Sequence, residues 1–394
     1  MKPKHYLRSV IMELVSLKLK ILALLIPTQK GLILFGSYSA VRFGDSSAAL
    51  FNYIKKAHPE FQAVWMTNSN PVKKMIEQNG GCAYKRRSLA GIWLSLRAEF
   101  AVSTHGVKDA ILFEPIYSNP KFIYLGHGIP LKKGWIQIEN APKKFVKSSL
   151  KKVKCSSFMI STSPFAAELQ NHFLPIGINK IKITGLPRND ILLSSDRQKT
   201  KKIFGLESYK KVICYAPTFR MQETIFLPFP DADLKLLNEF CTKCNICLVF
   251  RPHHNDIDNL ATSFWKEVKN CTNFRIITQK QCSNVNELLV ISDCLVTDYS
   301  SIYFDFLLLN RPLIFLPYDL DTYRKEHGFI VDYHSVTPGY KPKDQKEFLN
   351  NLKDIMAGND NFAAARIELC NKIHCYLDSN SCLRVTEEIK RIRK

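Results

Sequence analysis

Short apolar runs alternate with stretches of helical periodicity along most of the chain, and this alternation constrains the fold more than any other feature. Runs that are apolar at nearly every position are typical of parallel strands buried on both faces, with helices as the crossovers. The first half contains the candidate strands Leu32–Gly36, Ala63–Met66, Phe100–Ser103, Phe122–Leu125, Phe158–Ser161 and Ile181–Thr184. The second half contains Val212–Ala216, Ile246–Phe250, Phe274–Ile277, Cys294–Thr297, Leu313–Leu316 and Phe329–Val331. So many strands exceed one comfortable sheet, and we predict an α/β chain of two doubly wound, Rossmann-type domains.

The expected organisation has three parts. A basic amphipathic segment occupies residues 1–29, a first Rossmann-like domain residues 30–200, and a second such domain residues 201–394. The boundary is placed in the polar stretch Ser194–Tyr209, and helices follow from about Gln345. Two such domains are expected to face each other across a cleft. Ligands of open α/β sheets bind at the carboxyl ends of the strands, so the residues after each strand are the site candidates.

Charge and motif content narrow the function. Lys and Arg number 56 against 35 Asp and Glu, a formal net charge of +21, which predicts anionic partners. No Gly-x-Gly-x-x-Gly follows the first strand and no P-loop occurs, so dinucleotide redox chemistry and P-loop ATPase activity lose their main support. No nucleic-acid module is recognisable. Cys241, Cys244 and Cys247 resemble zinc spacing, but they fall on a helix and the next strand, so we predict neither a metal nor a cofactor.

Two segments point to a membrane surface. The first is the N-terminal stretch, where apolar residues from Tyr6 to Leu25 recur at helical spacing between basic residues, as in interfacial helices. The alternative is an ordinary amphipathic helix packed on its own domain. The second is Lys143–Lys154, which carries six lysines and no acid and suits either anionic lipid or a solvated helix face. No secretory signal and no apolar run long enough to span a bilayer is visible, so a peripheral protein on the cytoplasmic face is expected.

In the first half, two strand ends carry candidate residues. His127 lies between Gly126 and Gly128, where the backbone can approach a ligand closely and an imidazole can take a proton from a hydroxyl. The alternative is a turn whose histidine caps a helix. Arg188 follows the strand at Ile181–Thr184 and can bind phosphate, although a purely structural turn explains the Gly and Pro around it better.

In the second half, hydroxyl, guanidinium and imidazole groups follow two strands: Thr218, Arg220, Arg251, His253 and His254. A hydroxyl and a guanidinium two residues apart suit a phosphate, although an exposed loop arginine without a ligand is the alternative. An arginine and two histidines at one strand end are unusual for packing alone. The competing explanation there is an ion pair between Arg251 and Asp256.

The strand Cys294–Thr297 leads into Asp298, Ser300 and Ser301 and then a helical stretch at 302–309. A serine at a helix N-terminus is either a phosphate ligand or simply a cap. Asp305 lies four residues past Ser301 on the same helical face, where it accepts from a substrate hydroxyl or points to solvent.

Taken in order, these motifs resemble the CDP-glycerol glycerophosphotransferase family of teichoic acid and capsule synthesis, over about residues 30 to 385. The most specific block runs from Ile291 through Thr297-Asp298-Tyr299-Ser300-Ser301, Phe304-Asp305-Phe306, Arg311-Pro312-Leu313-Ile314-Phe315 and Tyr318-Asp319-Leu320 to Asp332. Smaller elements similar to the family's are His127-Gly128-Ile129-Pro130-Leu131-Lys132, Gly185-Leu186-Pro187-Arg188-Asn189-Asp190, Tyr215-Ala216-Pro217-Thr218-Phe219-Arg220 and Arg251-x-His253. The chain departs from the pattern at Ile129, where the family usually has Thr, and at Gly126, where an aromatic residue is common.

The resemblance implies a GT-B-like pair of Rossmann domains that binds the nucleotide in the C-terminal domain. It implies transfer of glycerol phosphate from CDP-glycerol to a hydroxyl of a glycerophosphate chain or a lipid-linked saccharide, with release of CMP. It also implies two important histidines, which map onto His127 and His253, and we assign His127 the role of general base. The expected substrate-binding residues are Lys132, Arg188, Thr218, Arg220, Arg251, His254, Asp298, Ser300, Ser301 and Asp305.

Three other readings remain open at this point. The first is a GT-B glycosyltransferase that uses a nucleotide sugar. The second is transfer of another polyol phosphate, such as ribitol phosphate, from its CDP derivative. The third is a non-catalytic basic protein that binds nucleic acid or membrane.

Overall fold

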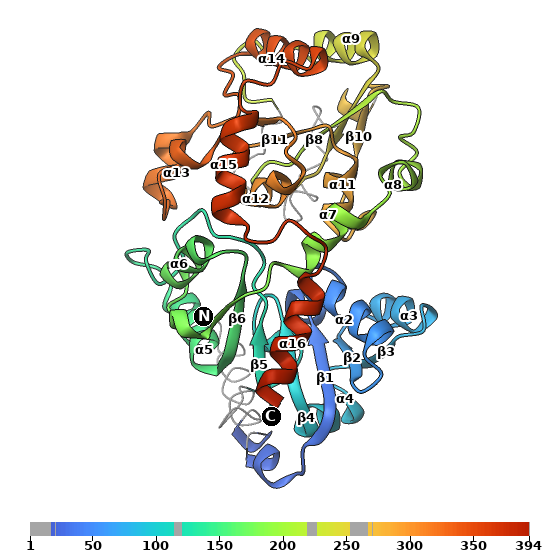
Figure 1. Cartoon of the computed structure of the whole chain (residues 1–394), viewed down its shortest axis with the longest axis vertical. Helices are drawn as coiled ribbons and strands as arrows, with labels where there is room; N and C mark the ends of the chain where they lie inside the picture. Colours follow the sequence, from blue (N-terminus) through green and yellow to red (C-terminus); the bar gives the residue numbers. More distant parts are fainter. Residues whose placement is uncertain are drawn as a thin grey trace, which may run out of the picture. The chain divides into compact units, whose positions relative to one another are not determined.

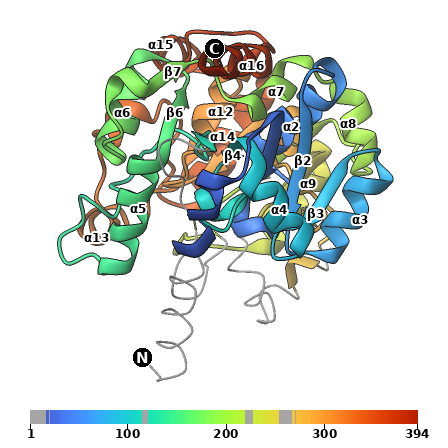
Figure 2. The same ribbon diagram turned by 90° about the horizontal axis from the view of Figure 1, so that it is seen from below.

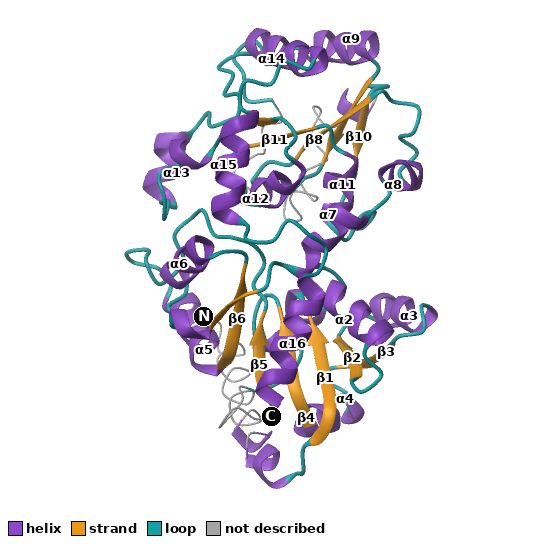
Figure 3. Cartoon of the chain, in the orientation of Figure 1, coloured by secondary structure: helices purple, strands orange, loops and turns teal. Residues whose placement is uncertain are grey.

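The computed structural model describes residues 17–19, 21–113, 120–218, 227–252, 267–269 and 271–393. The described residues fall into two compact units, the first within 1–127, 134–190 and 380–394, the second within 128–133 and 191–379. Each unit is a parallel sheet covered by helices (Figures 1 and 3). The predicted α/β class with two doubly wound domains is therefore confirmed.

Seven parallel strands form the sheet of the first unit, in the order β3-β2-β1-β4-β5-β6-β7. The strands are β1 (Gln29–Gly36), β2 (Gln62–Thr67), β3 (Cys82–Lys85), β4 (Ala98–Ser103), β5 (Lys121–Tyr124), β6 (Ser156–Ser161) and β7 (Ile181–Ile183). The helices are η1 (Tyr38–Ala40), α2 (Asp45–Ala57), α3 (Asn70–Gln78), α4 (Leu89–Arg97), η2 (Val107–Asp109), α5 (Lys143–Cys155), α6 (Pro164–Phe173), η3 (Ile178–Lys180), η4 (Pro187–Asn189) and α16 (Ser381–Arg393). Helices α5 and α6 lie by β6 toward one edge of this sheet, and α3 lies by β3 at the other (Figure 2).

Alternate residues of these strands enter separate apolar cores on the two faces of the sheet, as expected for strands buried on both sides. On β1, Ile33 and Phe35 join one cluster, and Leu32 and Leu34 join the other. The first cluster also contains residues of α2 and of the distant α16, so this last helix closes one face of the first sheet.

Five parallel strands form the sheet of the second unit, in the order β10-β9-β8-β11-β12. They are β8 (Lys211–Tyr215), β9 (Ile246–Phe250), β10 (Phe274–Ile276), β11 (Cys294–Thr297) and β12 (Leu313–Phe315). The helices are α7 (Asp190–Ser194), which begins at the last residue of the first unit, α8 (Arg197–Ile203), α9 (Leu234–Cys244), α11 (Val285–Ile291), α12 (Ile302–Phe306), η6 (Leu307–Leu309), α13 (Leu320–Glu326), η7 (His334–Val336), α14 (Gln345–Ala357) and α15 (Ala363–Ile373).

The two sheets share one topological feature. In each, the first strand lies in the interior, and the chain adds two strands on one side before it crosses to the other. The reversal falls between β1 and β4 in the first unit and between β8 and β11 in the second. Such a switch point leaves a crevice at the carboxyl ends of the two central strands, which is where open α/β sheets bind ligands.

The predicted and observed strands differ in two places, one strand that was not predicted and one prediction that is wrong. Strand β3 escaped prediction because it is a short edge strand with half-exposed residues and no apolar run. The predicted strand Phe329–Val331 is wrong: Phe329 forms only an isolated antiparallel bridge with Lys132, and its ring packs among Tyr299, Tyr323 and Tyr333. Aromatic packing in a loop therefore produced the apolar run.

The final helix, α16, packs on the first unit, whereas the expected boundary near residue 200 assigned it to the second domain. We expected residues 201–394 to form one domain, but α16 is grouped with the first unit. Its buried residues Cys382, Val385 and Ile389 complete a core of that unit, and Asp190 accepts hydrogen bonds from the Ser381 and Cys382 N–H groups at 2.9 Å each. Among the described residues, no helix is long and apolar enough to cross a bilayer.

We predict that α16 supports the first unit through its buried face. Val385 is fully buried in the core cluster, whereas Leu383 of the same helix is 41% exposed. Val385→Ala should lower the free energy of unfolding by about 1–3 kcal/mol, because it leaves a cavity, and Leu383→Ala should change it by less than about 0.5 kcal/mol. Urea denaturation measures both, and equal effects would contradict this packing.

Candidate active site

His127 follows β5 at the carboxyl edge of the first sheet. Gly126 has φ +63° and Gly128 φ +129°, values that side-chain-bearing residues rarely adopt, so the flanking glycines are required by the backbone of this turn. The His127 side chain is exposed to solvent. The sequence therefore placed this histidine correctly at a strand end, in a turn that leaves the imidazole accessible.

A second histidine, His105, lies directly against His127, and the sequence analysis did not find it. The two imidazole rings stack in parallel, with centroids 4.8 Å apart and an interplanar angle of 8°. His105 is held on its other side by the Tyr38 ring at 4.1 Å and by a 2.8 Å hydrogen bond between its Nδ1 and the Thr104 hydroxyl. A signal existed, since His105 follows β4 and precedes Gly106 much as His127 follows β5 and precedes a glycine.

Both histidines favour the neutral imidazole. Loss of hydration within the surrounding protein lowers the pKa of His127, although part of the side chain meets solvent. The Asp45 carboxylate opposes this shift, and the Lys152 and Arg188 cations reinforce it. Burial lowers the pKa of His105 well below its usual value, as does the neighbouring His127. A neutral His127 at pH 7 has a lone pair available to accept a proton.

Arg188 lies on η4, and its side chain contacts the turn that carries His127. Its guanidinium donates to the His127 carbonyl oxygen at 2.9 Å and contacts the Asp45 carboxylate at 3.4 and 3.5 Å. The Asp45 side chain is almost completely buried, so the pair is shielded from solvent. Arg188 thus orients the His127 backbone, and its assignment as a substrate ligand stays a prediction.

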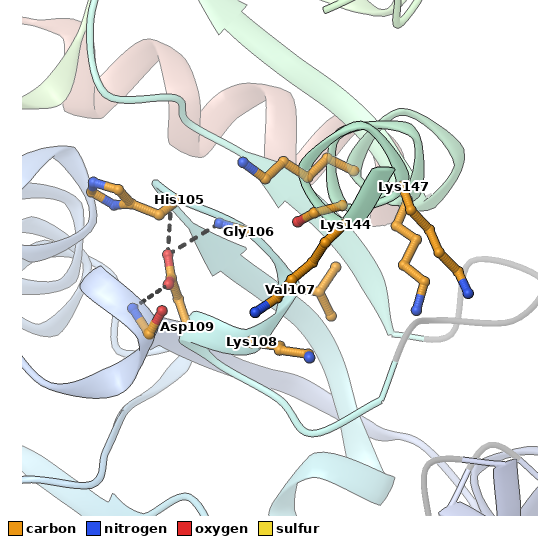
Figure 4. Close-up of a pocket in the computed structure, with 11 residues that line it drawn as sticks. His105, Gly106, Val107, Lys108, Asp109, Lys144 and Lys147 are labelled. Atoms are coloured by element: carbon orange, nitrogen blue, oxygen red, sulfur yellow. Dashed lines mark hydrogen bonds between the residues drawn. The ribbon is translucent and has the colours of Figure 1, made fainter. Parts of the chain in front are cut away.

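A buried carboxylate, Asp109, connects the two loops at the switch point of the first sheet. It accepts hydrogen bonds from four backbone N–H groups, of Ser39 at 2.7 Å, Thr104 at 3.2 Å, His105 at 2.7 Å and Gly106 at 3.3 Å. Figure 4 shows those from His105 and Gly106. Ser39 belongs to the loop after β1, and the other three to the loop after β4. Asp109 therefore fixes the backbone that carries His105, against which His127 stacks.

A buried carboxylate also joins two loops at the switch point of the second sheet. Asp298, which follows β11, is buried and accepts from the Thr218 N–H at 2.8 Å and the Tyr299 N–H at 2.6 Å. Thr218 follows β8, so the carboxylate again ties together the loops after the two central strands. The Tyr333 hydroxyl donates to the Asp298 carbonyl at 2.9 Å. The structure thus brings together Thr218 and Asp298, two residues that were chosen from separate motifs.

Ser300 and Ser301 lie next to this crevice, both half-exposed. Ser301 is the N-cap residue of α12, yet its side chain makes no capping hydrogen bond, so simple capping does not explain the hydroxyl. Helical structure over 302–309 is confirmed, as α12 followed by η6. Asp305 is buried rather than solvent-facing, which contradicts the idea that it points to water.

Arg251 and Lys132 are held by the second unit. The buried Arg251 guanidinium donates to the Ile277 carbonyl at 3.1 Å and the Cys282 carbonyl at 2.7 Å, so it joins three segments of backbone. The Lys132 ammonium lies 5.3 Å from the centre of the Tyr323 ring. Whether either residue touches a substrate stays a prediction.

Three predicted residues, Arg220, His253 and His254, lie outside the described residues. In the part of the chain that the structure describes, no three His, Cys, Asp or Glu side chains are grouped so that they could hold a metal ion. Cys241 and Cys247 are buried, and burial raises the pKa of each thiol to about 12, which opposes the thiolate that zinc requires.

The fold defines a class, that of two-domain α/β proteins with doubly wound parallel sheets, and here a histidine follows a strand of the first sheet. The sequence model of the CDP-Glycerol:Poly(glycerophosphate) glycerophosphotransferase family matches residues 18–391. The chain belongs to this family, as the motif resemblance predicted.

Similar proteins agree with this assignment. The chain is 28% identical to a teichoic acid poly(glycerol phosphate) polymerase of Bacillus spizizenii, over 84% of this chain and 85% of that protein. It is 28% identical to a teichoic acid glycerol-phosphate transferase of Staphylococcus aureus, over 91% and 93%. A solved structure of a variant of the wall teichoic acid polymerase TagF superimposes with a TM-score of 0.78 at 23% identity, over 99% of this chain and 97% of that one, and supports the GT-B-like fold.

We predict that Asp45 raises the pKa of His127. Asp45→Asn removes the opposing carboxylate and leaves Lys152 and Arg188 unbalanced, so the His127 pKa should fall further below its usual value. Titration of the His127 ring protons by NMR measures this shift. Glu77→Gln, on α3 by the far edge strand, should leave the His127 titration unchanged, and an upward shift in Asp45→Asn would contradict the prediction.

Proposed function

We propose that this protein transfers glycerol phosphate from CDP-glycerol to the terminal hydroxyl of a glycerophosphate chain or of a lipid-linked saccharide. The acceptor oxygen attacks the β-phosphorus, a phosphodiester bond forms, and the bond to CMP breaks. His127 accepts the proton of the attacking hydroxyl as general base. The observation that carries this proposal is the exposed imidazole of His127 at a strand end, whose lowered pKa keeps it ready to accept a proton.

The second unit is proposed to bind the donor, CDP-glycerol. Ser300 and Ser301 offer hydroxyl groups beside the crevice between β8 and β11, and Asp298 holds the Thr218 backbone there. Together with Arg220, His253 and His254, these residues bind the diphosphate and stabilise the leaving CMP. The remaining substrate contacts are proposed to come from Lys132, Arg188, Arg251 and Asp305. The two arginines also hold backbone segments near the site in place.

The protein also attaches to the cytoplasmic face of the membrane as a peripheral protein. Support comes from the helical residues 17–19 and 21–25, where Leu17, Ile21, Leu22 and Leu25 are all exposed. The lysine-rich helix α5 contributes no buried residue and adds positive charge. One apolar and one electrostatic signal together can hold a protein at an anionic surface where either alone is marginal.

The enzyme proposal is tested with a donor series and His127→Ala. Purified protein should release CMP from CDP-glycerol, more slowly from CDP-ribitol, and no UDP from UDP-sugars. Loss of the base should lower kcat by about 10²–10⁴-fold while thermal stability and CDP affinity stay close to the wild type. Release of UDP instead would favour the glycosyltransferase alternative, and a variant with normal turnover would remove His127 from the chemistry.

The membrane proposal is tested by sedimentation with vesicles that contain anionic phospholipid. The full chain should pellet with them at low salt and be partly released at high salt, because the Debye length falls from about 10 Å at 0.1 M to about 3 Å at 1 M. Deletion of residues 1–26 should release more protein. Neutral vesicles are the control, and no pelleting at low salt would overturn the proposal.

A further inference from the structure

A pocket of about 320 Å³ opens at the switch point of the first sheet, between η2 and one face of α5 (Figure 4). Its walls are the loop residues Ser39 and 105–109 on one side, and helix residues spaced three, four, seven and eight apart on the other. Lysines dominate this lining: Lys108, Lys144, Lys147, Lys151 and Lys152. The volume falls at the lower end of the range of about 300–1,000 Å³ that is typical of small-molecule sites.

Lysines outnumber acidic side chains in the lining of this pocket. Asp109 is the one acidic residue of the lining, and its carboxylate is occupied by four backbone N–H groups. Within the described chain, Lys108, Lys144, Lys147 and Lys152 form neither an ion pair nor a hydrogen bond with any carboxylate. Ammonium groups gathered without counter-charges repel one another, and an external anion relieves that repulsion.

Lys152 is the most strongly positioned member. Its stem runs over Gly106, where an added Cβ would come within 3.1 Å of Lys152 Cε, and Gly106 itself has φ +152°. Its ammonium lies 5.6 Å from the centre of the Tyr124 ring. Partial burial of the ammonium lowers the pKa of Lys152, although the Asp109 carboxylate opposes this shift. A cation in such surroundings interacts with an anion more strongly than a fully hydrated one does.

The pocket adjoins the proposed base. His105 forms part of the pocket wall, and its ring stacks on His127 at 4.8 Å. The His105 ring therefore lies between this pocket and His127, the residue that accepts the proton. In a glycerophosphate chain, the anionic group nearest the terminal hydroxyl is the phosphodiester of the last unit.

We propose that this lysine pocket binds a phosphodiester of the acceptor chain and so places the terminal hydroxyl at His127. The inference rests on the proposed function, because it assumes that the acceptor is a glycerophosphate chain. It divides the lysines of α5 by task. Lys144, Lys147, Lys151 and Lys152 face the pocket, whereas Lys143 and Lys154 lie outside it and remain available to anionic lipid.

The test compares Lys147→Gln/Lys152→Gln with a control, Lys56→Gln/Lys74→Gln, which removes the same charge from exposed positions on α2 and α3. Glutamine keeps most of each stem. With a soluble tri(glycerol phosphate) acceptor and CDP-glycerol, the pocket variant should raise the acceptor KM about tenfold or more, as expected for lost charge-assisted hydrogen bonds. Its kcat at saturating acceptor and its CDP affinity should remain near wild type, and the control should match wild type throughout.

Calorimetry with the same trimer, without donor, separates this inference from the enzyme proposal. If wild type transfers nothing but binds the trimer through the lysines, the proposed activity fails and the pocket stands. If wild type transfers but the pocket variant matches the control, the pocket fails alone. If the pocket variant loses binding to anionic vesicles and keeps its acceptor KM, the lysines bind lipid and the inference is overturned. Should the double variant unfold, Lys147→Gln alone, at an exposed position, gives the same comparison.

Discussion

Two buried carboxylates hold the functional edges of this molecule together. Asp109 and Asp298 each lie at the point where a parallel sheet reverses its strand order, and each accepts N–H groups from the loops after both central strands. Burying a carboxylate costs free energy unless hydrogen bonds replace its hydration, and the backbone N–H groups supply them. Burial still raises the pKa of Asp109 despite its four N–H donors. The buried carboxylate of Asp109 therefore lowers stability but fixes the geometry of the loops. The backbone positions of His105 and Thr218 are set by their N–H hydrogen bonds to Asp109 and Asp298.

The same requirement explains which parts of the site could be predicted from the sequence. Strands buried on both faces leave continuous apolar runs, so eleven of the twelve strands in the described residues are predicted, along with the residues at their carboxyl ends, among them His127 and Asp298. Asp109 could not be found in this way. Its importance depends on β4 lying beside β1, which is a matter of strand order rather than of local pattern.

The type and position of a basic residue in the sequence do not reveal which groups it contacts. Arg188 and Arg251 were chosen as phosphate ligands because they follow strands, yet both guanidiniums donate to backbone carbonyl groups. A guanidinium has five donors in a fixed fork, so it serves equally well to join segments of backbone. Conversely, the lysines of α5 looked like a uniform basic stretch, and only the fold shows that four of them share the face that lines a pocket.

The two sides of the proposed reaction are built with different rigidity. Thr218 and Asp298 stand on the ends of central strands within a fully buried sheet, which suits a donor of fixed size. Helix α5, which carries most of the pocket lysines, has no buried residue, and Phe145 and Leu150 on it remain 42% and 49% exposed. Few apolar contacts leave such a helix free to adjust locally at low cost. A growing polymer acceptor presents the same terminal phosphodiester whatever its length. The lysines of α5 can bind that group without contacts to the rest of the polymer.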